Sequence, residues 1–146
     1  MKNKFLKPIS KILKITKPFL MVDKITNLKI KKSCIGHKKI NLNEWFFSSH
    51  FIGEPTMPGT LLIESMLQTS AFLIYKSIKL KNERCIIASI QTKLFKKVNK
   101  NGSLKIYSNI KKFKKGTIQC ESYINYKKVR VCSASFLFIL PSEFKL

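Results

Sequence analysis

The stretch TLLIESMLQTSAFLIYKSI, residues 60–78, is apolar on nearly every side of a helical projection. It is long enough for about five helical turns. A helix that is hydrophobic all round is normally buried by other parts of the protein. Because Glu64 and Gln68 interrupt the run, it is a poor membrane span, and we expect a soluble protein built around one central helix.

The residues before this helix favour two strands. Residues 19–31 and 33–42 are predicted to form an antiparallel pair, since turn-forming residues lie between and after them. Helical spacing of apolar residues over 9–15 predicts a further helix of one or two turns, which Pro18 ends.

After the long helix, apolar and polar residues alternate, as in half-buried strands. Asn101-Gly102 and Lys115-Gly116 are predicted to be hairpin turns, and residues 129–140 to form a central strand because they are more continuously apolar. Two strands, a buried helix and four more strands indicate an α+β fold of the hot-dog type. In this fold a curved antiparallel sheet of about six strands wraps around one long helix. We expect a single domain over residues 1–146.

Composition limits the classes of protein that the chain fits. Its 146 residues are 45% hydrophobic, which argues against disorder. The net charge of +22 is typical of nucleic-acid-binding proteins, but only Arg84 and Arg130 are arginines and the lysines are spread along the chain. The abundance of Lys, Ile, Asn and Phe is what an AT-rich genome encodes. The charge therefore has two explanations, compositional drift or an acidic protein partner.

The four cysteines, at positions 34, 85, 120 and 132, form no C-x-x-C pair, and the two histidines complete no zinc-type spacing with them. We expect free thiols, packed as small core residues, in a reducing cytoplasm. The early apolar run, residues 19–22, is too short for a secretory signal.

Residues with catalytic chemistry surround the start of the long helix. His50 lies in a loop rich in Gly and Pro, and Glu64 lies one turn into the helix, with Gln68 on the same face. Burial would keep the Glu64 carboxyl protonated by raising its pKa, and an imidazole is a natural base near neutral pH. Gly59, at the helix N-terminus, offers an N–H to a carbonyl oxygen. These groups suit removal of a proton α to a carbonyl with loss of a β-hydroxyl. Spacing alone also fits a surface histidine and a glutamate that faces water.

The segment NEWFFSSHFIGEPTMPGTLLIESMLQ, residues 43–68, resembles the signature of the (3R)-hydroxyacyl-[acyl-carrier-protein] dehydratases. That signature is N-E-x-F-F-x-x-H-F-P-x-x-P-x-M-P-G-x-x-x-x-E-x-x-x-Q. The matching residues are Asn43, Glu44, Phe46, Phe47, His50, Phe51, Pro55, Met57, Pro58, Gly59, Glu64 and Gln68. Upstream, PFLMVDKI at residues 18–25 resembles the family's P-F-L-x-V-D-[RK]-[IV] strand.

The resemblance implies roles for these residues. His50 removes the α-proton, and Glu64 of the neighbouring subunit protonates the leaving hydroxyl. The Gly59 amide polarises the thioester carbonyl, and Gln68 orients Glu64. Glutamate at the acid position resembles the branch that does not isomerise the double bond. The substrate tunnel is expected to include Phe51, Met57, Pro58 and Phe95.

The resemblance also implies partners. It implies an acidic acyl carrier protein bearing the substrate, a homodimer with shared active sites that often assembles into a hexamer, and neither metal nor cofactor. We expect no membrane association.

The chain departs from the family pattern at three places, and the last of them concerns the substrate. Ile52 replaces a proline, Leu67 replaces a small residue, and the family's F-x-x-P-V-x-P-G-D segment is FKKVNKNGS at residues 95–103. The loss of both prolines and the aspartate leaves the acyl specificity open.

The predicted function is conversion of (3R)-3-hydroxyacyl-ACP to trans-2-enoyl-ACP and water in fatty-acid biosynthesis. One alternative keeps the chemistry but acts on a specialised thioester outside housekeeping fatty-acid synthesis. Another is a non-catalytic hot-dog protein that binds acyl carriers or nucleic acid. A hot-dog thioesterase is a further alternative, although thioesterases lack this arrangement of motifs.

Overall fold

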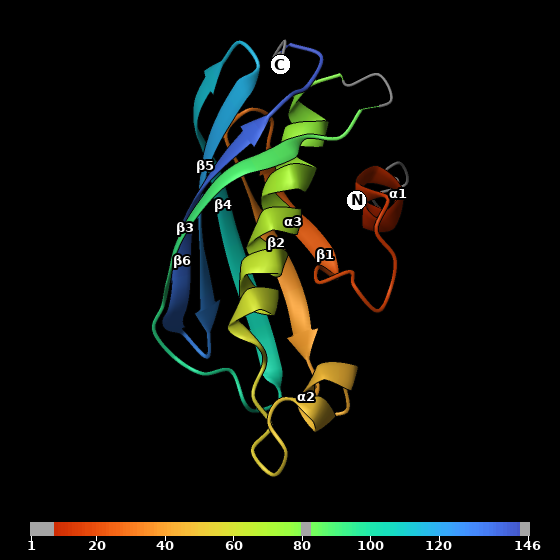
Figure 1. Ribbon diagram of the computed structural model, residues 1–146, viewed down its shortest axis with the longest axis vertical. Helices are drawn as coiled ribbons and strands as arrows, with labels where there is room; N and C mark the ends of the chain where they lie inside the picture. The colour runs from red at the N-terminus through yellow and green to blue at the C-terminus, as the bar shows by residue number, and fades with distance from the viewer. Residues whose placement is uncertain (1–7, 80–82, 144–146) are drawn as a thin grey trace.

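In the computed structural model, which describes residues 8–79 and 83–143, a curved antiparallel sheet of six strands wraps around one long helix (Figure 1). The strands follow the order β1-β2-β4-β5-β6-β3 across the sheet. Their bounds are Lys24–Lys29 (β1), Ser33–Ile40 (β2), Ile86–Leu94 (β3), Gly102–Lys114 (β4), Thr117–Tyr126 (β5) and Val129–Ile139 (β6). The helices are Ile9–Leu13 (α1), Trp45–Ser49 (α2) and Gly59–Ser77 (α3). The predicted α+β fold of the hot-dog type is confirmed.

The central helix α3 is buried on most sides, as its composition predicts, and contacts β2, β4, β5, β6 and α1. Small side chains let it lie close to the sheet. Ser70 and Ser108 share a hydrogen bond of 2.7 Å between their hydroxyl oxygens, across the contact with β4. A Cβ atom added at Gly36 of β2 would lie 2.5 Å from Oγ1 of Thr69. Helix and sheet are therefore in direct contact.

Two expectations about the strands are wrong. The first strand begins at Lys24 and not at residue 19, because the backbone N–H of Phe19 and that of Leu20 donate to the Thr16 carbonyl in a turn. Asn101-Gly102 is not a hairpin turn, because β3 and β4 are not neighbours and the loop between them crosses to the other part of the sheet. Lys115-Gly116 does join two paired strands, and β6 lies inside the sheet as predicted.

Strand β3 is the last strand on one side of the sheet, and all nine of its residues are exposed. An outermost strand presents backbone N–H and C=O groups that pair readily with another chain. Its side chains are also unusually apolar for an exposed segment. The large hydrophobic residues exposed on it and directly after it are Ile86, Ile87, Ile90, Leu94 and Phe95.

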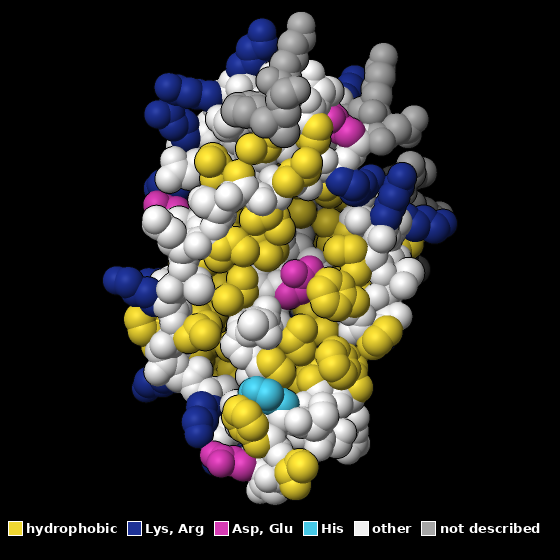
Figure 2. Space-filling model, viewed as in Figure 1, with side chains coloured by type: hydrophobic (Ala, Val, Ile, Leu, Met, Phe, Trp, Pro, Cys, Tyr) yellow, Lys and Arg dark blue, Asp and Glu magenta, His cyan; other side chains and the backbone are white. Residues whose placement is uncertain are grey.

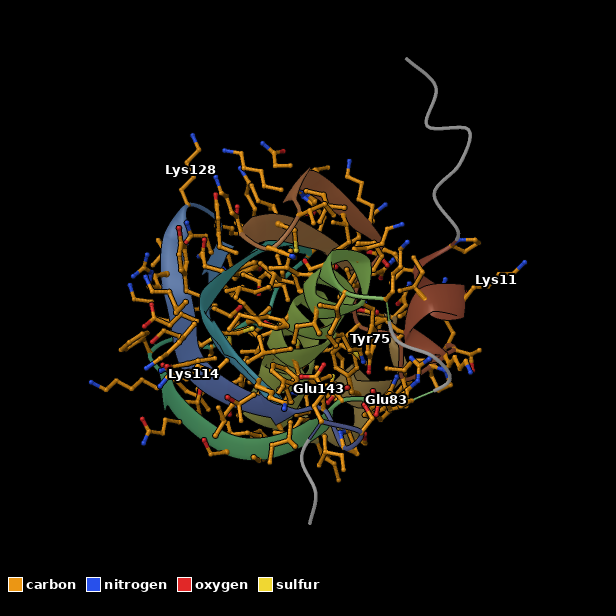
Figure 3. The ribbon with its side chains drawn as sticks, turned by 90° about the horizontal axis from the view of Figure 1, so that it is seen from above. Lys11, Tyr75, Glu83, Lys114, Lys128 and Glu143 are labelled. Atoms are coloured by element: carbon orange, nitrogen blue, oxygen red, sulfur yellow. The ribbon has the colours of Figure 1, made fainter. Side chains whose placement is uncertain are left out.

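The charged side chains are dispersed. In Figure 2 hydrophobic side chains fill the middle of the visible face, and most Lys and Arg side chains stand around its rim. Lys11, Lys114 and Lys128 come from separate parts of the chain and extend outwards on different sides (Figure 3). Within residues 8–79 and 83–143, no helix has both the length and the apolar character needed to cross a membrane.

Candidate active site

His50 is half-buried at the C-terminal end of α2, where Phe46 and Phe47 anchor the short helix in the core. Its ring nitrogen Nδ1 lies 2.9 Å from the carbonyl oxygen of Thr56. A carbonyl oxygen only accepts hydrogen bonds, so Nδ1 carries the proton. The other ring nitrogen, Nε2, therefore has a free lone pair in the neutral imidazole, as a base requires.

Three further contacts hold this loop in place. The backbone N–H of Thr56 donates to the His50 carbonyl at 2.7 Å, and that of Met57 donates to the Val98 carbonyl at 2.8 Å. Before α2, the ammonium of Lys38 lies 2.6 Å from a carboxylate oxygen of Glu44, and the Lys38 side chain is only 5% exposed. The histidine is thus fixed from both ends of its loop.

Glu64 is half-buried on α3, and its Oε1 accepts a hydrogen bond of 2.8 Å from the Gln68 side-chain amide. The predicted contact between these residues is therefore present. Gln68 is itself fixed, because its Nε2 also donates to the Phe19 carbonyl at 3.0 Å while its Oε1 accepts from the Met21 N–H at 2.7 Å. The Phe19 carbonyl can only accept a hydrogen bond and the Met21 N–H can only donate one, so the positions of Nε2 and Oε1 in the Gln68 amide are determined.

Burial raises the pKa of the Glu64 carboxyl, and the hydrogen bond from Gln68 opposes part of this rise. Desolvation is the larger influence because it penalises only the charged form. The acid keeps its proton to a higher pH than an exposed glutamate. This is the direction that the sequence predicts and that a proton donor needs.

His50 and Glu64 line two different cavities of the chain. The His50 cavity has a volume of about 270 Å³ and is also lined by Thr56, Met57, Gly59, Leu62, Leu94 and Phe95. The Glu64 cavity has a volume of about 510 Å³, and its apolar walls include Leu13, Ile15, Leu67, Ile87 and Phe138. Strand β3 contributes to both cavities, with Leu94 at one and Ile87 at the other.

The residues predicted to line the tunnel divide into two groups. Met57 and Phe95 line the His50 cavity, whereas Phe51 and Pro58 do not line either cavity. Phe51 is 53% exposed and its ring centroid lies 3.8 Å from that of His50. Pro58 is the residue directly before α3. As the first residue of that helix, Gly59 has an N–H without a partner inside the helix.

The sequence did not single out other residues at the site. The role of Thr56 is carried by its backbone carbonyl, which leaves no signal in a pattern of side chains. Tyr75 lines the Glu64 cavity. The sequence could have identified it, because it lies eleven positions after Glu64 and therefore on the same helical face. Arg84 and Cys85 line it too, but they come from a different part of the chain.

Comparison with known proteins supports one family. A family description, FabA-like domain, matches residues 14–132. The chain is 35% identical over 131 residues to the 3-hydroxyacyl-[acyl-carrier-protein] dehydratase FabZ of Lactobacillus helveticus, covering 88% of this chain and 87% of the relative. It is 40% identical over 107 residues to the FabZ of Clostridium botulinum, covering 73% of this chain and 74% of the relative.

Solved structures support the fold. The dehydratase heterocomplex ApeI:P from Xenorhabdus doucetiae matches with a TM-score of 0.77 and 13% identity, over 95% of each chain. A hypothetical thioesterase from Streptococcus pneumoniae matches with a TM-score of 0.64 and 14% identity, over 80% of this chain and 83% of the other. At such identities the likeness concerns the fold alone. The extent of the sequence matches is decisive: the chain belongs to the 3-hydroxyacyl-[acyl-carrier-protein] dehydratase family with a FabA-like domain.

Proposed function

We propose that His50 and Glu64, supplied by two different subunits, are the base and the acid with which this chain dehydrates (3R)-3-hydroxyacyl-ACP to trans-2-enoyl-ACP. The chain is a hydro-lyase of fatty-acid biosynthesis, as its family membership indicates. The observation that carries the residue roles is the pair of hydrogen-bond settings. The Thr56 carbonyl leaves Nε2 of His50 free to accept a proton, and Glu64 is half-buried against Gln68, where burial raises the pKa of its carboxyl.

These two groups account for every proton that is transferred in the elimination. Nε2 of His50 takes the proton from C2, and the electron pair of that C–H bond forms the C2–C3 double bond. The C3–O bond breaks, and the departing hydroxyl takes the proton of Glu64 and leaves as water. Return of the proton from His50 to Glu64 restores the site. The Gly59 N–H stabilises negative charge on the thioester oxygen as C2 loses its proton.

The edge strand β3 supports the proposed two-subunit arrangement. Within one chain, the His50 cavity lies beside Leu94 and the Glu64 cavity beside Ile87, near opposite ends of β3. If two β3 strands pair antiparallel about a two-fold axis near their middle, each end meets the opposite end of the other strand. The His50 cavity of one subunit then adjoins the Glu64 cavity of the partner subunit. Such pairing also covers the exposed hydrophobic residues of β3.

The substrate reaches this composite site on its carrier. Met57 and Phe95 form the wall for the thioester end. The carrier is an acidic protein, which suits the net charge of +22. We place the reaction in the cytoplasm, in a homodimer that also permits a hexamer built from dimers.

The residue roles are tested by single and double substitutions. A positioned acid or base contributes about 10²–10⁴-fold to the rate. His50→Ala and Glu64→Gln are each expected to lower kcat by about that factor, measured as loss of hydroxyacyl-ACP, with circular dichroism as a check on folding. Because both residues act in one transition state, the double variant should be barely slower than either single variant. Dehydration at a near wild-type rate by either single variant would refute the assignment.

A further inference from the structure

The Glu64 cavity runs along one face of α3. The helix residues that line it include Glu64, Gln68, Ala71 and Tyr75, which follow the three- and four-residue spacing of a single face. From Glu64 to Tyr75 the helix rises by about 16 Å. Between these two ends, Ala71 is the smallest side chain on that face of the helix. The cavity is therefore a lane with the acid at one end and an aromatic ring at the other.

The walls of this lane suit an alkyl chain. Ile15, Leu67 and Phe138 are among the apolar side chains that line it. In the proposed reaction the C3 hydroxyl lies at Glu64, so the carbons beyond C3 extend from there. The lane is the cavity that begins at the acid, and burying methylene groups against its apolar walls stabilises the bound chain.

Tyr75 is held firmly at the far end. Its hydroxyl accepts a hydrogen bond of 3.0 Å from the backbone N–H of Cys85, and the Cys85 thiol lies 3.2 Å from the same oxygen. The guanidinium carbon of Arg84 lies 4.7 Å from the centre of the Tyr75 ring, which places a cation over its face. Figure 3 shows Tyr75 on the side of α3 that faces the N-terminal segment.

Arg84 also fixes the wall opposite the helix. It donates from Nη1 to the Ile12 carbonyl at 3.0 Å and to the Leu13 carbonyl at 3.4 Å. Leu13 itself and the nearby Ile15 line the lane. One arginine thus connects the end of the lane to its outer wall, so neither moves aside easily for a longer chain.

We infer that Tyr75, held by Arg84 and Cys85, is the stop that sets the longest acyl chain this enzyme accepts. The inference rests on the proposed function and adds a specificity-determining residue to it. Chains that end before the ring bury their full length in the lane. Longer chains meet an aromatic side chain whose hydroxyl is already hydrogen-bonded and whose face is already covered.

The experiment measures kcat/KM for a series of (3R)-hydroxyacyl-ACP substrates that differ by two carbons. Tyr75→Ala is expected to extend the accepted length by at least one two-carbon step. For the first length that the wild type rejects, kcat/KM should rise by about tenfold or more, the usual discrimination per methylene. Tyr75→Phe keeps the ring and should keep the wild-type limit. Ala71→Leu narrows the lane before the stop and should shorten the limit.

Comparison of relative rates across lengths separates specificity from a general loss of activity. Phe113→Ala removes a ring from the exposed part of β4, outside both cavities, and should leave the length profile unchanged. Turnover of 3-hydroxybutyryl-ACP by the wild type establishes the proposed function independently. If the wild type acts on that substrate but Tyr75→Ala and Ala71→Leu both keep the wild-type profile, the stop is not Tyr75. If the wild type acts on no hydroxyacyl-ACP, the proposed function itself is wrong.

Discussion

Two opposing influences act on the pKa of Glu64: burial raises it, and the hydrogen bond from Gln68 lowers it by a smaller amount. A group whose pKa is raised in the folded protein stabilises that state fully only below its unfolded pKa, near 4.5 here. This contribution is lost as the pH rises through the folded pKa. Deprotonation of Glu64 therefore makes the folded protein less stable, while it also removes the proton that the proposed mechanism needs.

Replacement of Glu64 by glutamine removes this titration and keeps the size of the side chain. The melting temperature of Glu64→Gln relative to the wild type should therefore increase as the pH is raised from about 4 to neutral. Differential scanning calorimetry at several pH values measures the difference. A difference that stays constant over this range would show that Glu64 has an ordinary pKa.

At the scale of residues, the sequence predicted those side-chain contacts that join neighbouring positions of one helix. The contact between Glu64 and Gln68 follows from their spacing of four. The contacts of Gln68 with Phe19 and Met21 do not, because they join segments almost fifty positions apart. Residues 19–23 resemble part of a strand, but they lie before β1, and the backbone groups of Phe19 and Met21 bind Gln68 instead.

At the scale of elements, α3 lies too close to β2 at Gly36 and Thr69 to leave room for a larger residue at position 36. The Cβ of an alanine at position 36 would lie 2.5 Å from Oγ1, 3.1 Å from Cγ2 and 3.4 Å from Cβ of Thr69. Gly36→Ala is expected to lower the free energy of unfolding by about 1–3 kcal/mol, the usual cost of overpacking. Urea denaturation provides the measurement.

The matched control is a double-mutant cycle. Thr69→Ala removes the atoms that would clash, so the double variant Gly36→Ala, Thr69→Ala should lose less stability than the sum of the two single effects. Additive losses would place the cause elsewhere, in the conformation of the β2 backbone.

The connection between β3 and β4 also belongs to this scale. Asn101-Gly102 has the composition of a hairpin turn, yet β3 pairs with β6 and β4 pairs with β2 and β5. Local composition indicates a turn but not which strands it joins, because the pairing is decided by contacts distant in sequence. Local composition predicted six strands and the long helix, but it did not predict α2 within the expected loop or the order of the strands in the sheet.

At the scale of the whole molecule, the net charge of +22 is either a means of attracting the carrier or a consequence of composition. Attraction between exposed charges is screened by salt. If the charge recruits an acidic carrier, KM for the carrier-bound substrate should rise steeply with ionic strength while kcat changes little. Steady-state kinetics from about 10 to 300 mM salt provide the comparison. A KM that does not depend on salt would leave composition as the explanation.

The proposed assembly of two chains around β3 is the feature on which the catalytic proposal depends. The sequence motif predicted His50 and Glu64, and the family resemblance implied that they come from two subunits, but no pattern in the residues indicates that they line two cavities within one chain. That separation became visible only from the lining of the cavities and from the exposure of all nine residues of β3.

The most direct test combines two inactive chains in one dimer. His50→Ala and Glu64→Gln chains, co-expressed with different affinity tags, give a mixed dimer that can be purified. In a site shared between subunits, one of its two sites joins an intact His50 to an intact Glu64. The mixed dimer should therefore regain about half of the wild-type activity. In a control dimer, a doubly substituted chain is paired with a wild-type chain, and both shared sites are then broken. An inactive mixed dimer together with a half-active control would contradict the account, because each site would then lie within a single chain.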